Sequence, residues 1–155
     1  MAIAKISEIK KELENLEFKD LLEISLRLTK FKKENKELLS FLLFEADDIS
    51  SFIQRVKNDV EQQFFQINKS NVYFIKKGVR KILRIVNKQV RFSSSKQVEA
   101  ELLIHFCNCI ISNSIPIKNS SQLLNLYKNQ LKKIEGALLL LHEDLQYDLR
   151  RQIIQ

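Results

Sequence analysis

Hydrophobic residues recur at spacings of three and four along most of the chain, with polar residues between them. This spacing places apolar side chains on one face of a helix, so it predicts a succession of amphipathic α-helices. The stretch from Leu38 to Phe44 is almost continuously apolar, and we expect its helix to lie at the centre of the molecule. The expected helices cover approximately residues 3–15, 20–33, 35–46, 50–67, 70–90, 96–112 and 122–147.

Short polar runs mark the ends of these helices. Asp47 and Asp48 interrupt the apolar stretch, and we interpret them as a cap for the next helix rather than as a metal site. The serines of residues 93–95 end one helix and cap the following one. Pro116 disfavours helix at the residue before it, so the sixth helix is expected to end ahead of it.

One long helix is expected to close the chain, from about Gln122 past Tyr147. Its apolar residues alternate at steps of three and four, which is typical of a helix packed along a partner. The residues of this leucine seam are Leu131, Ile134, Leu138, Leu141 and Leu145. Gly136 costs about 1 kcal/mol relative to Ala inside a helix, so we expect it to allow a close approach by a neighbouring helix.

The composition supports an all-α fold. Two Gly and one Pro among 155 residues are too few for the turns of an all-β sandwich or barrel. A hydrophobic share of 45% and a charged share of 29% exclude a disordered tail and a membrane protein. The length predicts a single domain over residues 1–155, built as an irregular bundle of six or seven helices or as a short HEAT-like superhelix of helix pairs.

The amino-terminal residues and the cysteines bear on location. Charges occur every few positions in residues 5–12, whereas a secretory signal needs an uninterrupted apolar stretch. Cys107 and Cys109 lie two residues apart, and one helical turn points them to different sides, so we expect no disulfide between them. We therefore predict a cytoplasmic protein with reduced cysteines.

The net charge of +7 is concentrated in one segment. Residues 62–98 contain nine basic residues and no Asp or Glu, a net charge of +9. Residues 1–61 carry 11 basic and 13 acidic residues, and residues 99–155 carry six of each. The rest of the chain is therefore close to neutral, and the excess charge belongs to the expected helix at about 70–90 and its flanks.

The basic residues of this segment share one face of the expected helix. At 100° per residue, those from Lys69 to Arg91 fall within an arc of roughly 140°, beside an apolar stripe of roughly 100°. Tyr73 lies within the arc. Such a row of cations suits the phosphate backbone of DNA or RNA, and the aromatic ring suits an unpaired base. The candidate nucleic-acid-binding residues are Lys69, Tyr73, Lys76, Lys77, Arg80, Lys81, Arg84, Lys88, Arg91 and Lys96.

The serine turn beside Arg91 and Lys96 adds hydroxyls and free backbone N–H groups at a helix amino terminus, where a phosphate or carboxylate is stabilised. The alternatives are a solvated face that lies against acidic residues elsewhere in the chain, or the docking surface of an acidic protein partner. We expect no membrane partner, because Tyr73 is the only aromatic residue inside the arc. A different class of function, protein–protein interaction or self-association through the last helix, follows from the leucine seam.

Candidate catalytic and metal-binding residues are few. His105 and Cys109 share a helix face, but Cys107 points away from it, and a structural zinc site needs four ligands. Glu101 and His105 are four residues apart and could form an acid–base pair, although an ordinary helical pair has the same spacing. Glycine-rich phosphate loops and nucleophile elbows are absent from the sequence. We therefore expect a protein that binds rather than catalyses, without a cofactor or a metal.

A Lys-rich first helix containing Glu8-Ile-Lys-Lys-Glu-Leu precedes a second helix that begins Phe18-Lys-Asp-Leu-Leu-Glu and a third that contains Asn35-Lys-Glu-Leu-Leu. This order, over residues 8–45, resembles the opening helices of a family of small bacterial all-helical proteins. No activity is assigned to that family, so the resemblance implies a helical hairpin and no function. The paired short helices also resemble HEAT-like scaffolds, and that likeness implies a binding role.

Overall fold

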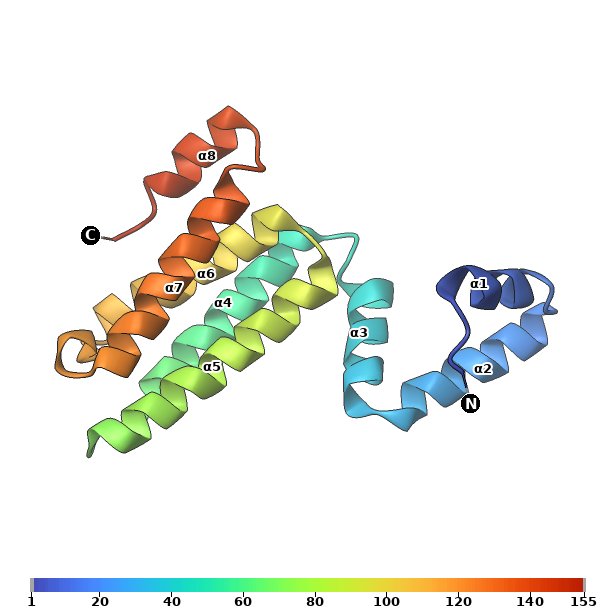
Figure 1. Ribbon diagram of the computed structural model, residues 1–155, viewed down its shortest axis with the longest axis horizontal. Helices are drawn as coiled ribbons and strands as arrows, with labels where there is room; N and C mark the ends of the chain where they lie inside the picture. The colour runs from blue at the N-terminus through green and yellow to red at the C-terminus, as the bar shows by residue number, and fades with distance from the viewer. Residues whose placement is uncertain (1, 155) are drawn as a thin grey trace. The chain divides into compact units, whose positions relative to one another are not determined.

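The computed structural model describes residues 2–154, and these residues form eight α-helices and one short 3-10 helix, without a β-strand (Figure 1). The predicted all-α class is confirmed, and the helices are one or two more than predicted. Their bounds are α1 (Ile6–Glu14), α2 (Phe18–Phe31), α3 (Lys33–Phe44), α4 (Ile49–Phe65), α5 (Val72–Ser93), α6 (Lys96–Ser112), η1 (Ile117–Asn119), α7 (Ser121–Leu138) and α8 (Glu143–Arg150).

The chain divides into two compact units, residues 1–44 and residues 45–155. We call them the N-terminal unit and the C-terminal unit. No run of Gly, Pro or Ser marks the boundary, which directly follows α3. The prediction of one domain over the whole chain stays a prediction.

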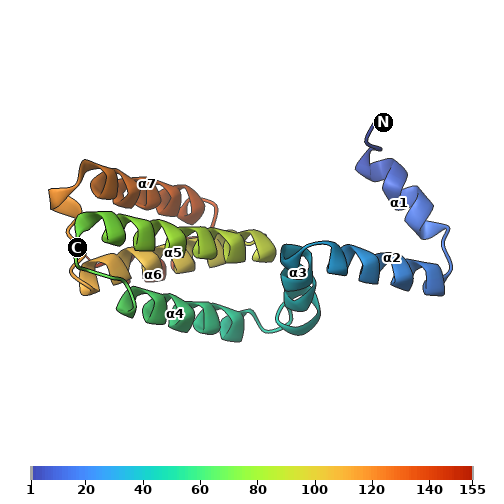
Figure 2. The ribbon, with the colours of Figure 1, turned by 90° about the horizontal axis from the view of Figure 1, so that it is seen from below.

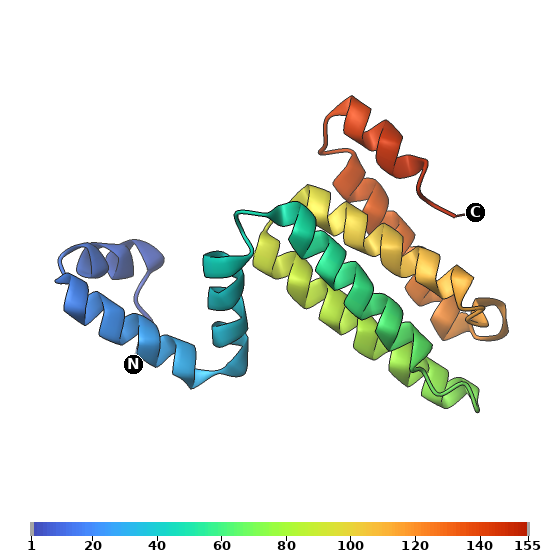
Figure 3. The ribbon, with the colours of Figure 1, turned by 180° about the vertical axis from the view of Figure 1, so that it is seen from behind.

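The C-terminal unit is a helical bundle in which α6 is the central helix. Helices α4, α5 and α7 run alongside α6, and the three views show the same arrangement (Figures 1, 2 and 3). Helix α6 is apolar on most sides, so it can be enclosed by several neighbours at once. Its buried residues are Val98, Ala100, Leu102, Leu103, Ile104, Phe106, Cys107, Cys109 and Ile110.

The expectation that the helix of residues 38–44 is central is therefore wrong. Among the residues of α3, Phe41 alone is buried, whereas Leu43 is 60% and Phe44 80% exposed. Within the N-terminal unit, α3 packs chiefly on α2. A unit of three short helices has too little volume to enclose an all-round apolar helix.

The predicted single last helix is also wrong, because the chain turns after α7 and starts again as α8. Nδ1 of His142 accepts a hydrogen bond from the backbone N–H of Asp144 (3.2 Å) and so caps α8. Glu143 and Asp144 then stand in the first turn, where negative charge is favourable. Gln146 Nε2 donates to the Leu141 carbonyl at 2.8 Å, which satisfies a backbone acceptor in the turn.

Two residues of the leucine seam pack inside the C-terminal unit, and the other three are partly exposed. Ile134 and Leu138 are buried on α7, which lies along α6. Gly136 lies on the exposed side of α7, and a Cβ atom built on it would meet no atom within 4 Å. The expected close approach at Gly136 is therefore wrong, because the seam and the glycine face opposite directions.

The helix caps predicted at Asp48 and in the serine turn are confirmed. Asp48 Oδ1 accepts from the Ser51 N–H at the start of α4 (3.2 Å), and Oδ2 accepts from the Ser51 hydroxyl (2.7 Å). Ser95 and Ser120 accept from the third backbone N–H of α6 and α7, respectively. None of the helices among residues 2–154 is long and apolar enough to cross a lipid bilayer.

Candidate nucleic-acid interface

Helix α5 presents the predicted basic face because its opposite face is locked into the bundle. Ile75, Val79, Ile82 and Val86 are buried on α5, which packs on α4 and α6. The Asn71 side chain starts the helix by accepting from the Phe74 N–H at 3.0 Å. With the apolar stripe turned inward, the arc of basic residues can only point away from the core.

The structure places eight of the ten candidate binding residues on α5. Seven of them are cations, which we call the cationic face: Lys76, Lys77, Arg80, Lys81, Arg84, Lys88 and Arg91. The eighth is Tyr73, which is 67% exposed. Lys69 precedes the helix and donates its ammonium to the Asn113 carbonyl at 2.8 Å. Lys96 lies on α6 and forms an ion pair with Glu99 at 2.9 Å.

Several charges of the cationic face are not neutralised locally. Lys77, Arg80, Lys81 and Arg84 are exposed, and no carboxylate of the C-terminal unit, over its described residues 45–154, forms an ion pair with them. Arg80 has one polar contact, in which Nη2 donates to Oε1 of Gln122 on α7 (3.2 Å). That acceptor is a neutral amide and not a carboxylate.

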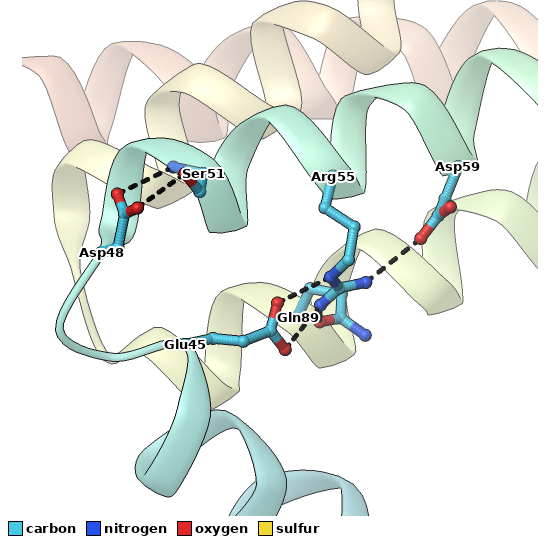
Figure 4. A network of polar contacts seen from close by, with 6 residues as sticks. All are labelled: Glu45, Asp48, Ser51, Arg55, Asp59 and Gln89. Carbon is cyan, nitrogen blue, oxygen red and sulfur yellow. Dashed lines mark hydrogen bonds and ion pairs between the residues drawn. The ribbon is translucent and has the colours of Figure 1, made fainter.

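Arg55, on α4, shows how a structural arginine is held in the same unit (Figure 4). Its guanidinium binds both carboxylate oxygens of Glu45, at 2.6 and 3.0 Å, and an oxygen of Asp59 at 3.1 Å. It also contacts Gln89 of α5 and lies over the ring of Phe52. These carboxylates raise the pKa of Arg55 further above its usual value. The arginines of the cationic face have no such arrangement, so bundle packing does not account for them.

A hollow of about 250 Å³ lies at the border of the cationic face, between the end of α4 and the first turns of α5. Lys77 and Lys81 stand at this hollow together with the half-exposed ring of Phe74. Three side-chain amides complete its polar lining, those of Gln63, Gln66 and Asn68. The hollow therefore combines positive charge, an aromatic ring and hydrogen-bonding groups.

A second hollow, of about 390 Å³, lies at the serine turn between α5 and α6. Arg91 and Lys96 line it, as expected for an anion site, but so does the carboxylate of Glu99. The Val98 N–H already donates to the hydroxyl oxygen of Ser95 (3.3 Å), so this backbone donor is not free for an anion. Glu99 in the first turn of α6 therefore opposes a bound anion at the place where the sequence suggested one.

The candidate acid–base pair does not form. No hydrogen bond or ion pair joins Glu101 and His105 in the described part of the chain, and Glu101 instead accepts from Gln97 (2.9 Å) and lies 3.8 Å from the Lys57 ammonium. His105 Nε2 lies 3.2 Å from the Lys57 carbonyl and 3.2 Å from a Glu61 carboxylate oxygen. Burial lowers the pKa of His105, and the Glu61 charge partly opposes that shift.

The two cysteines are free thiols packed in the bundle. Burial raises the pKa of Cys107 to about 12 and that of Cys109 to about 11, so both stay protonated near neutral pH. Cys109 Sγ lies 3.5 Å from His105 Nε2, the nitrogen that also faces Glu61. A catalytic triad needs the carboxylate on the other ring nitrogen, and this arrangement is therefore one of packing. No group of three metal-ligating side chains occurs among residues 2–154.

Sequence reasoning missed the amides and the glycine of the first hollow. Gln63 and Gln66 are on or beside the last turn of α4, Asn68 is in the following turn, and Gly78 is on α5. Two signals pointed to them: the amide side chains cluster at residues 62–68, and Gly78, one of two glycines in the chain, lies inside the acid-free segment. Their meeting depends on how α4 packs against α5, which the sequence pattern does not specify.

Comparisons with protein-family models, with curated proteins and with solved structures find no match for this chain. The resemblance of residues 8–45 to small bacterial helical proteins stays a prediction. The site must therefore be interpreted from its own geometry and charge.

Proposed function

We propose that the C-terminal unit binds nucleic acid through the phosphate backbone, with the cationic face of α5 as its contact surface. The observation that carries this proposal is that four cations of α5 are exposed and form no ion pair with a carboxylate in the described part of their own unit: Lys77, Arg80, Lys81 and Arg84. Keeping like charges this close costs stability, and a polyanion would offset that cost. No catalytic step is part of the proposal.

The affinity of such binding and its dependence on salt follow from electrostatics. Each cation placed near a phosphate releases a condensed counterion, so affinity falls steeply with salt and depends little on sequence. With three to six contacts, dissociation constants of about 10⁻⁶ to 10⁻⁴ M are expected near physiological salt. Arginine adds a forked geometry that matches phosphate oxygens, and Arg80 and Arg84 lie one turn apart on the exposed side of the helix.

The test is fluorescence anisotropy with labelled single-stranded and double-stranded DNA and RNA of about 20 nucleotides, at 50 mM and 200 mM salt. We expect the full chain to bind all four at 50 mM and to lose most of its affinity at 200 mM. The double variant Arg80→Glu with Arg84→Glu should lower affinity at least about tenfold. It should also reduce the slope of log K against log salt by about 1.8 on duplex DNA, because two phosphate contacts are lost.

A matched control carries the same change of charge elsewhere. Lys132→Glu with Lys133→Glu alters two exposed lysines of α7 outside the cationic face and should leave most of the affinity intact. If both double variants lose affinity equally, the binding reflects net charge and not α5. If the unmutated chain binds no nucleic acid at 50 mM salt, the proposal is wrong, and an acidic protein becomes the partner to test against the same face.

A second candidate function, self-association, is favoured by the N-terminal unit. Among its described residues 2–44, Phe41 alone is buried, and 14 large hydrophobic residues are exposed. Ser25, Leu28, Leu38 and Leu42 line an apolar groove of about 320 Å³ between α2 and α3. An exposed apolar surface of this extent marks an interaction site. The seam of α7 no longer supports this function, because Ile134 and Leu138 are used within the bundle.

A further inference from the structure

The hollow between α4 and α5 has the lining of a small binding site. It lies where the last turn of α4, the turn at residues 66–71 and the first three turns of α5 meet. Binding sites for small groups combine apolar walls with a few convergent polar groups. Here the apolar wall comes from Phe74, Ile67 and Ile82, and the polar groups come from three amides and two lysines.

Gly78 lines the hollow and packs closely against Ile67. A Cβ atom at this position would lie 3.0 Å from Cγ1 of Ile67, so any larger residue would have to push the Ile67 side chain aside. Glycine costs about 1 kcal/mol relative to Ala inside a helix. Glycine at this position therefore lets the Ile67 side chain pack directly against the backbone of α5.

The side-chain amides at the rim have donors and acceptors that are available for a ligand. The side chains of Gln63 and Gln66 have no hydrogen bond within the described part of the chain. Asn68 Oδ1 accepts from the Ser70 N–H at 3.0 Å, which leaves its NH₂ group to donate. An amide carries a donor and an acceptor side by side, as the edge of a nucleobase does.

The aromatic and basic groups suit the other parts of a nucleotide. The Phe74 ring is 40% exposed and is held edge to face by Tyr73, with ring centroids 5.5 Å apart. An exposed aromatic face beside a basic row stacks on unpaired bases. Lys77 and Lys81 are one turn apart, about 6 Å along the helix axis, and can both reach a phosphate at the mouth of the hollow.

We propose that this hollow holds one nucleotide, with its base on Phe74, the base edge at the amides and the phosphate at Lys77 and Lys81. This inference rests on the proposed function and deepens it, since a duplex keeps its bases stacked and cannot insert one. The nucleotide is one position of a single strand or a free nucleoside monophosphate. In the first case, α5 prefers single-stranded over double-stranded nucleic acid.

The experiment compares a labelled single strand of 12 nucleotides, its duplex form, and the same strand with abasic sugars in place of the bases. Phe74→Ala should lower affinity for the single strand about tenfold, the effect of losing one base stack, and should leave affinity for the duplex and the abasic strand unchanged. Phe65→Ala is the matched control, because Phe65 is 88% exposed, lies at the end of α4 and does not line the hollow. It should change none of the three affinities.

A second variant, Asn68→Asp, tests the same hollow if Phe74→Ala does not fold. Asn68→Asp retains the oxygen that accepts from Ser70 but removes the NH₂ donor and adds a negative charge at the exposed rim. Asn68→Asp should lower the affinity for the single strand more than the affinity for the duplex. Equal effects on single strand and duplex in both variants, or no effect in either, would overturn the nucleotide site.

Adenosine monophosphate distinguishes the source of the nucleotide. Added at millimolar concentration, it should shift the backbone amide signal of Gly78 in an NMR spectrum of the full chain if the free nucleotide is the ligand. If the single strand alone shifts that signal, the site is a position along a strand. If Arg80→Glu with Arg84→Glu abolishes binding while Phe74→Ala changes nothing, the proposed function stands and the nucleotide site falls.

Discussion

His105 is a titratable side chain packed within the bundle. It lies mostly buried on α6, where its ring nitrogen faces the Lys57 carbonyl, and burial lowers its pKa from the usual 6.5. Glu61, which is exposed, favours the charged ring, and the Lys57 ammonium disfavours it. Because burial is the largest of these causes, the neutral ring is the form that the folded chain prefers.

This preference predicts that the free energy of unfolding decreases as the pH falls. As the pH drops through about 6.5, the unfolded chain takes up the proton more readily than the folded chain, so the free energy of unfolding decreases. Urea unfolding at pH 8, 6.5 and 5.5 measures this decrease, and His105→Gln should flatten it. Parallel curves for the two proteins over this range would show that His105 does not carry the effect.

At the scale of the helix, the two glycines of this chain are opposite cases. Gly136, on α7, has open space around it, whereas a Cβ atom on Gly78 would press on Ile67. A helix loses about 1 kcal/mol for each glycine in place of alanine. At Gly136 this loss has no compensating contact, and at Gly78 it permits the packing of the α4–α5 turn.

Gly136→Ala should therefore raise the free energy of unfolding by about 1 kcal/mol, through better helix propensity and a less flexible unfolded chain. Gly78→Ala gains the same propensity but must displace Ile67, so its effect should be smaller or opposite in sign. Chemical unfolding of both variants under one set of conditions makes the comparison. A larger gain at Gly78 than at Gly136 would contradict this account.

Most helix positions could be predicted because each depends on local signals. Residues 96–112 were located to the residue, since Ser95 caps one end and Pro116 follows the other. The apolar stripe of α5 also lies on the buried side as its spacing indicated. These features are set by neighbours within one or two turns of the chain.

Features that depend on tertiary neighbours could not be predicted in this way. The end of α7 lies inside an unbroken apolar period, and a histidine cap together with a glutamine side chain decides it. Residues 38–44 and 96–112 are both strongly apolar, and only the number of surrounding helices determines which one becomes central. The cationic residues were found from spacing, whereas the amides of the hollow come from another helix and from the turn that follows it.

Across the whole molecule, net charge and exposed apolar residues are distributed unequally between the two units. Residues 1–44 carry nine basic and eight acidic residues, while residues 45–155 carry 17 basic and 11 acidic residues. Two copies of the chain therefore repel through their C-terminal units and can meet through their nearly neutral N-terminal units. The exposed leucines of α2 and α3 supply the surface to be buried in such a contact.

We expect the chain to form a dimer or larger assembly as its concentration rises from 10 to 200 µM, with a light-scattering mass above 18.3 kDa. Leu22→Glu with Leu26→Glu, on the exposed face of α2, should restore the monomer mass. Leu139→Glu with Leu140→Glu changes two exposed leucines of the C-terminal unit and should not restore it. A monomer at 200 µM for the unmutated chain would rule out self-association, and the N-terminal unit would then need another partner.

The crowding of like charges on α5 has a further consequence for the energetics of the protein. Lys76 with Arg80, Lys77 with Lys81, and Arg80 with Arg84 are pairs four residues apart, and each such pair destabilises a helix by about 0.2–0.5 kcal/mol. Dissolved ions screen this repulsion and also compete for phosphate. Added salt should therefore raise the stability of the unbound protein and lower its affinity for a polyanion. The same row of side chains thus makes the stability of the unbound protein and the fraction bound to a polyanion change in opposite directions with salt.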